Sequence, residues 1–192
     1  MGGAMEFSWK KEIILDKALC KTAGVIVFIL LTTAGAYVRI PLPFTPVPLT
    51  LQTFFVVLSG AVLGASFGAL SQIGYMLLGV TGLSVFTGSG SGLLYLTGPT
   101  GGYIFGFIVS SFLVGKALHT TRKSFISIFF TLMMADLLIL CCGMLWLKCA
   151  FGYPFARLLL IGFFPFVPGD LAKVCAAAML YKKIRPRTEE IF

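Results

Sequence analysis

Long apolar runs separated by short polar segments dominate the chain. The runs cover approximately residues 20–38, 50–63, 68–80, 101–118, 125–147 and 155–181. Because a membrane-crossing helix needs about 20 apolar residues, the six runs predict an all-α integral membrane six-helix bundle. The second and third runs are short and nearly continuous, so they predict either a bent hairpin or a re-entrant pair. Residues 1–192 are expected to form a single transmembrane domain.

The composition supports a membrane protein with no separate soluble domain. Hydrophobic residues make up 58% of the 192 residues, charged residues make up 11%, and the mean hydropathy is +0.98. Soluble domains carry about 25% charged residues. The net charge of +8 would suit a nucleic-acid partner, but the cations lie beside apolar runs. That placement is typical of membrane topology, so a lipid bilayer is expected as the environment, and no nucleic acid.

The distribution of lysine and arginine predicts the orientation. Eleven of these 15 residues fall at three places that six spans put on one side of the membrane. They are Lys10, Lys11, Lys17 and Lys21, then Lys116, Arg122 and Lys123, and finally Lys182, Lys183, Arg185 and Arg187. Cytoplasmic loops are enriched in cations. We therefore expect a multi-pass protein of the plasma or inner membrane with both termini cytoplasmic, and a first run too long to be a cleaved signal peptide.

Motifs for metal binding and nucleotide hydrolysis are missing from the sequence. The five cysteines form no CxxC pair, and His119 is the single histidine, so we expect no metal site. No GxxxxGK[ST] or HExxH segment occurs. We expect no cofactor and no enzymatic activity, and any nucleotide hydrolysis would come from another chain.

The last apolar run contains the strongest indication of a binding site. Pro165 and Pro168 interrupt it, and Asp170 and Lys173 follow at a spacing that puts both on one helix face. Charges at membrane depth are costly and usually face a cavity, and broken helices mark the binding sites of transporters. The interpretation is a site for a small polar solute. Two structural alternatives stay open, namely Asp170 as a helix N-cap after Gly169 and an internal Asp170–Lys173 pair.

Two other polar residues lie in apolar runs. Gln52 can either satisfy loop carbonyls or face an amide-like ligand. Asp136 lies in the middle of the fifth run with no cation within one helical turn, so it is protonated, paired across helices or part of a proton relay. An intramembrane enzyme that uses Asp136 and Asp170 as acid and base is an alternative function.

Two unusual loops are expected on the outer side, together with the break before Asp170. Residues 39–48 hold four prolines and must be extended. Residues 82–102 are rich in Gly, Ser and Thr, with interleaved aromatic residues. These loops are expected to form a lid and pocket. Glycines also recur at a spacing of four, as at Gly60, Gly64 and Gly68, which predicts close helix packing within the chain rather than an oligomer interface.

Four segments resemble BioY, the family of biotin-binding S components of energy-coupling factor (ECF) transporters. They are RIPLPFTPVPLTLQT (39–53), GLSVF (82–86), LTGPTGGY (96–103) and PFVPGDLAK (165–173). The resemblance implies an ECF S-component-like six-helix fold with a substrate pocket near the outer face. It also implies partners, namely a transmembrane T component and a pair of ATP-binding-cassette ATPases, because S components hydrolyse no ATP.

The resemblance further implies which residues contact biotin: Gln52, Phe86, Thr87, Tyr95, Asp170 and Lys173. Asp170 or Gln52 would accept the ureido N–H groups, and Lys173 would donate to the ureido oxygen or to the valerate carboxylate. Phe86 and Tyr95 would pack on the thiophane ring. Which polar residue takes which end of biotin stays open, and an S component for a different vitamin is an alternative.

Two features depart from the family pattern. S components commonly carry an AxxxA face on the first helix for docking the T component, whereas here Thr33 and Ala36 stand in that region. Asp136 belongs to no motif of the family. Association with a second copy of the chain, as a homo-oligomer, also stays open.

Overall fold

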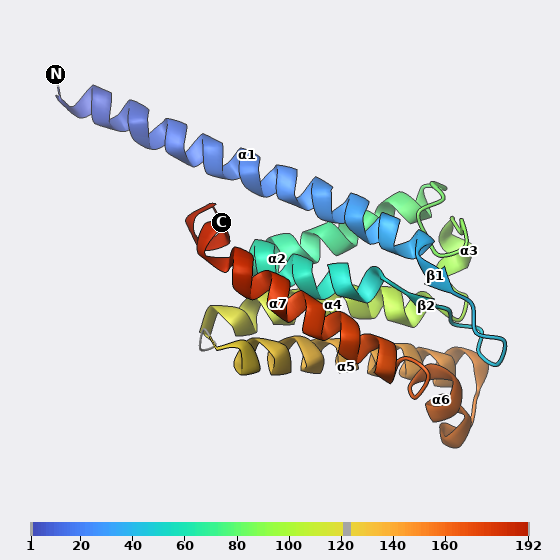
Figure 1. Ribbon diagram of the computed structural model, residues 1–192. Helices are drawn as coiled ribbons and strands as arrows, with labels where there is room; N and C mark the ends of the chain where they lie inside the picture. Colours follow the sequence, from blue (N-terminus) through green and yellow to red (C-terminus); the bar gives the residue numbers. More distant parts are fainter. Residues whose placement is uncertain (1, 121–123, 192) are drawn as a thin grey trace.

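The fold is a bundle of helices with two short extended segments at one end (Figure 1). The computed structural model describes residues 2–120 and 124–191, and the side chains of residues 18–120, 124–186 and 188. The elements in chain order are α1 (Gly2–Tyr37), β1 (Arg39–Ile40), β2 (Leu49–Thr50), α2 (Gln52–Val80), α3 (Leu93–Leu96), α4 (Gly101–Thr120), α5 (Phe125–Phe151), α6 (Phe155–Gly162) and α7 (Val167–Ile191).

Helix α2 is a helical hairpin, which explains why the second and third apolar runs are short. Gly64 has φ +78° and ψ −177°, a conformation that only glycine adopts readily, and it breaks the helix. The Gln52 side chain hydrogen-bonds Tyr75, although 23 residues of straight helix would hold them about 35 Å apart. The two arms of α2 therefore lie side by side, and the hairpin alternative for residues 50–63 and 68–80 is the one the structure adopts.

The last span is broken, as the prolines indicate. Helices α6 and α7 meet at a bend of 50°, and residues 163–166 form the turn between them. Within the described residues, four helices are long and apolar enough to cross a membrane, and the bent α6–α7 pair makes a fifth. Because α2 folds back on itself, its two arms correspond to the second and third apolar runs, and the expected all-α fold is confirmed.

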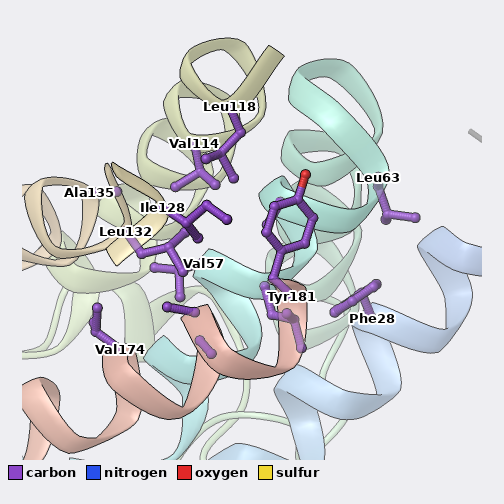
Figure 2. Packing of buried hydrophobic residues seen from close by; sticks show 14 of the residues in the cluster. Phe28, Val57, Leu63, Val114, Leu118, Ile128, Leu132, Ala135, Val174 and Tyr181 are labelled. Atoms are coloured by element: carbon purple, nitrogen blue, oxygen red, sulfur yellow. The ribbon is translucent and has the colours of Figure 1, made fainter. Parts of the chain in front are cut away.

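The two ends of the bundle differ in character. Both chain termini lie at one end, with the end of α4 and the start of α5, while β1, β2, α3 and α6 lie at the other (Figure 1). We call the latter the loop end. The side chains between the helices form two apolar clusters. The cluster at the terminal end is drawn in Figure 2, where Phe28, Leu132 and Tyr181 from three helices converge.

Large apolar side chains cover much of the helix surface. Leu30, Ile126 and Leu145 are each more than 60% exposed. Soluble monomers rarely expose large contiguous apolar patches, so this surface is suited to lipid and not to water.

Small residues allow the helices to approach closely. A Cβ added at Gly60 would lie 2.2 Å from the backbone oxygen of Ser111, and one at Gly115 would lie 2.2 Å from the backbone nitrogen of Ala65. A Cβ at Gly68 would meet the backbone of Gly60, from the other arm of α2. Gly60 and Gly68 therefore serve packing within the chain, as expected, whereas a Cβ at Gly64 would meet nothing within 4 Å and this residue instead breaks the helix.

Gly60→Ala is expected to destabilise the protein by about 1–3 kcal/mol, the usual cost of overpacking. The added Cβ would clash with the backbone of Ser111 in α4, which cannot move aside as a side chain can. Gly74→Ala in the same helix is the matched control, since its added Cβ would meet only the flexible end of Ile29. The measurement is thermal unfolding of the purified protein in detergent. Equal melting temperatures for the two variants would contradict the proposed α2–α4 contact.

Candidate functional site

A cavity opens at the loop end, among α2, α4, α5 and α7 and the loop that follows α2. Its empty space measures about 510 Å³ when the part open to solvent is counted. Ile104, Phe107 and Leu140 give it an apolar side. The lining is also partly polar, and it includes five of the six residues that the sequence analysis selected: Gln52, Thr87, Tyr95, Asp170 and Lys173.

Lys173 is the positively charged residue of the cavity lining. Its ammonium group makes an ion pair of 2.5 Å with Asp170. It also donates hydrogen bonds to the carbonyl oxygen of Thr50 at 3.0 Å and to the hydroxyl of Thr53 at 2.7 Å. Two of its three protons are therefore donated in hydrogen bonds, while Asp170 supplies the opposite charge. The side chain is only 12% exposed, and these partners compensate a charge that is largely removed from water.

Asp170 lies inside α7 rather than at its cap. The helix begins at Val167, and the backbone N–H of Asp170 donates to the carbonyl of Phe166. The N-cap alternative was therefore wrong, because Pro168 and Gly169 fit within the first turn, where a proline N–H is not needed. Asp170 is 3% exposed, and neither carboxylate oxygen accepts a well-oriented hydrogen bond from the described residues. Its contact with Lys173 is an ion pair, so both oxygens retain capacity to accept N–H donors.

Gln52 is held by a network that connects the two arms of α2 to the next loop. Its amide donates to the Tyr75 hydroxyl at 2.7 Å, and its carbonyl accepts from the Thr87 hydroxyl at 2.9 Å. The Tyr75 hydroxyl donates to the carbonyl of Val85, and the Tyr95 hydroxyl donates to the carbonyl of Thr87. Gln52 is 4% exposed. The network fixes the orientation of the polar side chains that line this part of the cavity.

Phe86 lies outside the cavity lining. It is fully buried, its ring stacks on Tyr95 at a centroid distance of 4.8 Å, and it meets Tyr75 edge-on at 5.6 Å. A Cβ at Gly79 would lie 2.0 Å from this ring, so only glycine leaves room for it. In the described structure, Phe86 supports Tyr95 from behind, and Tyr95 presents the aromatic face to the cavity.

Asp136 reaches the same cluster from α5. Its carboxyl group interacts with Asp170, Lys173 and Thr53, and the residue is 1% exposed. Two buried carboxyl groups therefore face one ammonium group. No set of three His, Cys, Asp or Glu side chains suited to a metal occurs among the described residues.

Sequence reasoning missed several lining residues. Thr50 and Thr53 accept the Lys173 protons, Tyr75 holds Gln52, and Tyr103 donates to the carbonyl of Gly162 from its place in the lining. Tyr75 is a polar aromatic residue inside an apolar run, and Thr50 and Thr53 lie one on each side of Gln52. Those signals were visible, but they could not show which helices are neighbours.

Comparison with known proteins agrees with these observations. The family model described as "BioY family" matches residues 10–190. The chain belongs to the BioY family.

Two relatives illustrate the relationship. The "Probable biotin transporter BioY" of Pyrococcus horikoshii is 36% identical over 164 residues, which cover 85% of this chain and 95% of the relative. The "Biotin transporter BioY" of Thermotoga maritima is 38% identical over 159 residues, which cover 83% and 92%. Both relatives are named as transporters, so the expectation that this BioY family member is not an enzyme is confirmed.

A solved structure confirms the fold. The crystal structure of the S-component for biotin from an ECF-type ABC transporter superposes with a TM-score of 0.74, and the match covers 93% of each chain. The two sequences are 24% identical, so the similarity concerns the fold of this BioY family member and not the details of its cavity.

The two carboxyl groups predict an energetic coupling between Asp136 and Lys173. Lys173→Met alone should destabilise the protein by about 3–5 kcal/mol, because it leaves buried carboxylates without a cation. Asp136→Asn keeps the shape and removes one carboxyl group, so the same Lys173→Met change should cost less in that background. Thermal or denaturant unfolding of the four proteins in detergent gives the coupling energy. Strictly additive effects would contradict the contact between α5 and α7.

Proposed function

We propose that this chain is the substrate-binding S component for biotin uptake, energised by a separate T component and ATPase subunits. The observation that carries the proposal is the buried Asp170 carboxylate, which lines the cavity beside Lys173 and accepts no well-oriented hydrogen bond from the described residues. A carboxylate in that state is suited to accept the two N–H groups of a ureido ring. The family membership of the chain and the names of its relatives support biotin as the ligand.

The cavity offers a complementary surface for each part of biotin. Asp170 accepts the ureido N–H groups, and Lys173 donates to a ligand oxygen by exchanging one of its threonine partners. Tyr95 packs against the ring system, with Phe86 as its support. Gln52 and Thr87 complete the polar side. The thiophane ring is mostly apolar, which fits the lining residues Ile104, Phe107 and Leu140.

The proposal includes the orientation and the partners. The loop end faces the outside, and both termini face the cytoplasm, because most lysines and arginines of the sequence flank the terminal end of the bundle. No Walker-type segment occurs in the sequence, so the energy comes from ATP-binding-cassette ATPases through the T component. The region of Thr33 and Ala36 on α1 is the expected docking face.

A competition panel tests the ligand. The purified protein in detergent is expected to bind biotin at submicromolar concentration without ATP, since the cavity is formed by this chain alone. Riboflavin and thiamine should not compete, because neither presents a ureido ring to Asp170. Calorimetry that detects no heat at saturating biotin would reject the proposal. Binding of another vitamin in place of biotin would indicate an S component with a different substrate. Chemical conversion of biotin would support the alternative that the protein is an enzyme.

Biotin binding by substituted proteins tests which residues form the site. Asp170→Asn combined with Lys173→Met should leave a monodisperse protein that has lost about 2–5 kcal/mol of biotin affinity, the usual cost of truncating buried charged contacts. Lys148→Met is the matched control, because Lys148 is exposed and lies outside the cavity lining. Retained affinity in the double variant would refute the site assignment and leave the family membership intact.

Energy coupling gives a separate expectation. Vesicles that contain only this protein should bind biotin but not concentrate it, because the chain carries no motif for nucleotide hydrolysis. Addition of a compatible T component and ATPases should produce ATP-dependent accumulation of radiolabelled biotin. Concentrative uptake by the single chain would contradict the proposed division of labour.

A further inference from the structure

A second hollow, which we call the vestibule, adjoins the cavity. The two share Pro48, Thr87, Tyr95 and Thr100 as lining residues. The vestibule encloses about 680 Å³, counting the part open to solvent. Arg39 is the charged residue among the described residues that line it. A ligand whose head lies against Asp170 can therefore extend past Tyr95 into a space that a guanidinium group borders.

The backbone around Arg39 is well anchored. Arg39 lies on β1, where it pairs with Thr50 of β2, the same residue whose carbonyl accepts from Lys173. Its guanidinium lies against Gly88, since a Cβ added there would come within 2.4 Å of Nη1. Gly88 has φ +76°, which other residues rarely adopt, so the close approach and the backbone both favour glycine. The side chain is thus placed between the two loops that form the mouth of the vestibule.

The charge of Arg39 has no acidic partner nearby in the sequence. The seven acidic residues are Glu6, Glu12, Asp16, Asp136, Asp170, Glu189 and Glu190. Residues 38–51 and 81–100, which build the mouth, therefore carry no negative side chain. The other cation of the site, Lys173, is already paired with Asp170 and donates hydrogen bonds to Thr50 and Thr53. Lys148 and Arg157 line neither hollow, and Arg157 lies over the Tyr153 ring at 4.7 Å.

We propose that Arg39 binds the carboxylate of the ligand at the mouth of the vestibule while the ureido head lies against Asp170. The inference rests on the proposed function and adds the direction in which the ligand lies. The site then selects elongated molecules with N–H donors at one end and an anionic group at the other. An arginine fork suits this role because it can hold both carboxylate oxygens.

The experiment compares biotin with its primary amide, which keeps the ring system and removes only the negative charge. The wild-type protein in detergent is expected to bind biotin more tightly than the amide. Arg39→Gln should raise the Kd for biotin at least about fivefold, a modest effect because the side chain is exposed, and should change the Kd for the amide less than about twofold. Arg157→Gln is the matched control for loss of one exposed cation and should change neither.

The outcomes separate the two proposals. If biotin binds the wild type and Arg39→Gln weakens biotin and the amide equally, or weakens neither, the assignment of Arg39 is overturned and the proposed function stands. If Arg157→Gln weakens biotin as much as Arg39→Gln, general surface charge explains the effect and the assignment is again overturned. If the wild type binds neither compound, both proposals fail. Arg39→Lys should lie between the wild type and Arg39→Gln, because it keeps the charge but loses the fork.

Discussion

The three contacts of the Lys173 ammonium hold the candidate site together. An ammonium group in an apolar bundle is costly unless it is paired and hydrogen-bonded, and the three contacting groups come from separate parts of the chain. Asp170 belongs to α7, the carbonyl of Thr50 belongs to β2, and Thr53 belongs to the first arm of α2. The break between α6 and α7 allows this arrangement, because the turn at residues 163–166 lets α7 begin close to the cavity.

The polar residues that α2 contributes to the cavity depend on the bend in the middle of this helix. The Gly64 break turns the helix back, and the close packing of Gly60 against Gly68 and Ser111 keeps the two arms together. Only because the arms are adjacent does Tyr75 reach Gln52. Small residues at the terminal end of the bundle thus position polar residues at the loop end, and a substitution there can affect ligand binding without touching the cavity.

The sequence predicted the features that depend on local order. Proline positions indicated the broken last helix, the spacing of Asp170 and Lys173 placed them on one face, and residues 39–48 could not be helical. It could not show that Asp136 of α5 reaches Asp170, because this contact depends on which helices pack together. The same limit applies to Phe86. Its aromatic ring and its place in a family motif predicted a ligand contact, but the ring packs behind Tyr95. Helix periodicity identifies a buried face and not the neighbour that buries it.

The hydrogen bonds around Thr50 connect the site mechanically to α1. The carbonyl of Thr50 holds Lys173, its strand pairs with Arg39, and the backbone N–H of Leu51 donates to the carbonyls of Gly35 and Val38. Under the proposed function, a ligand that takes the place of the Thr50 carbonyl on Lys173 would remove a hydrogen bond from the β2 segment or move it. Since the last turn of α1 is tied to that segment, the outermost helix of the bundle has a direct route by which to register whether the cavity is occupied.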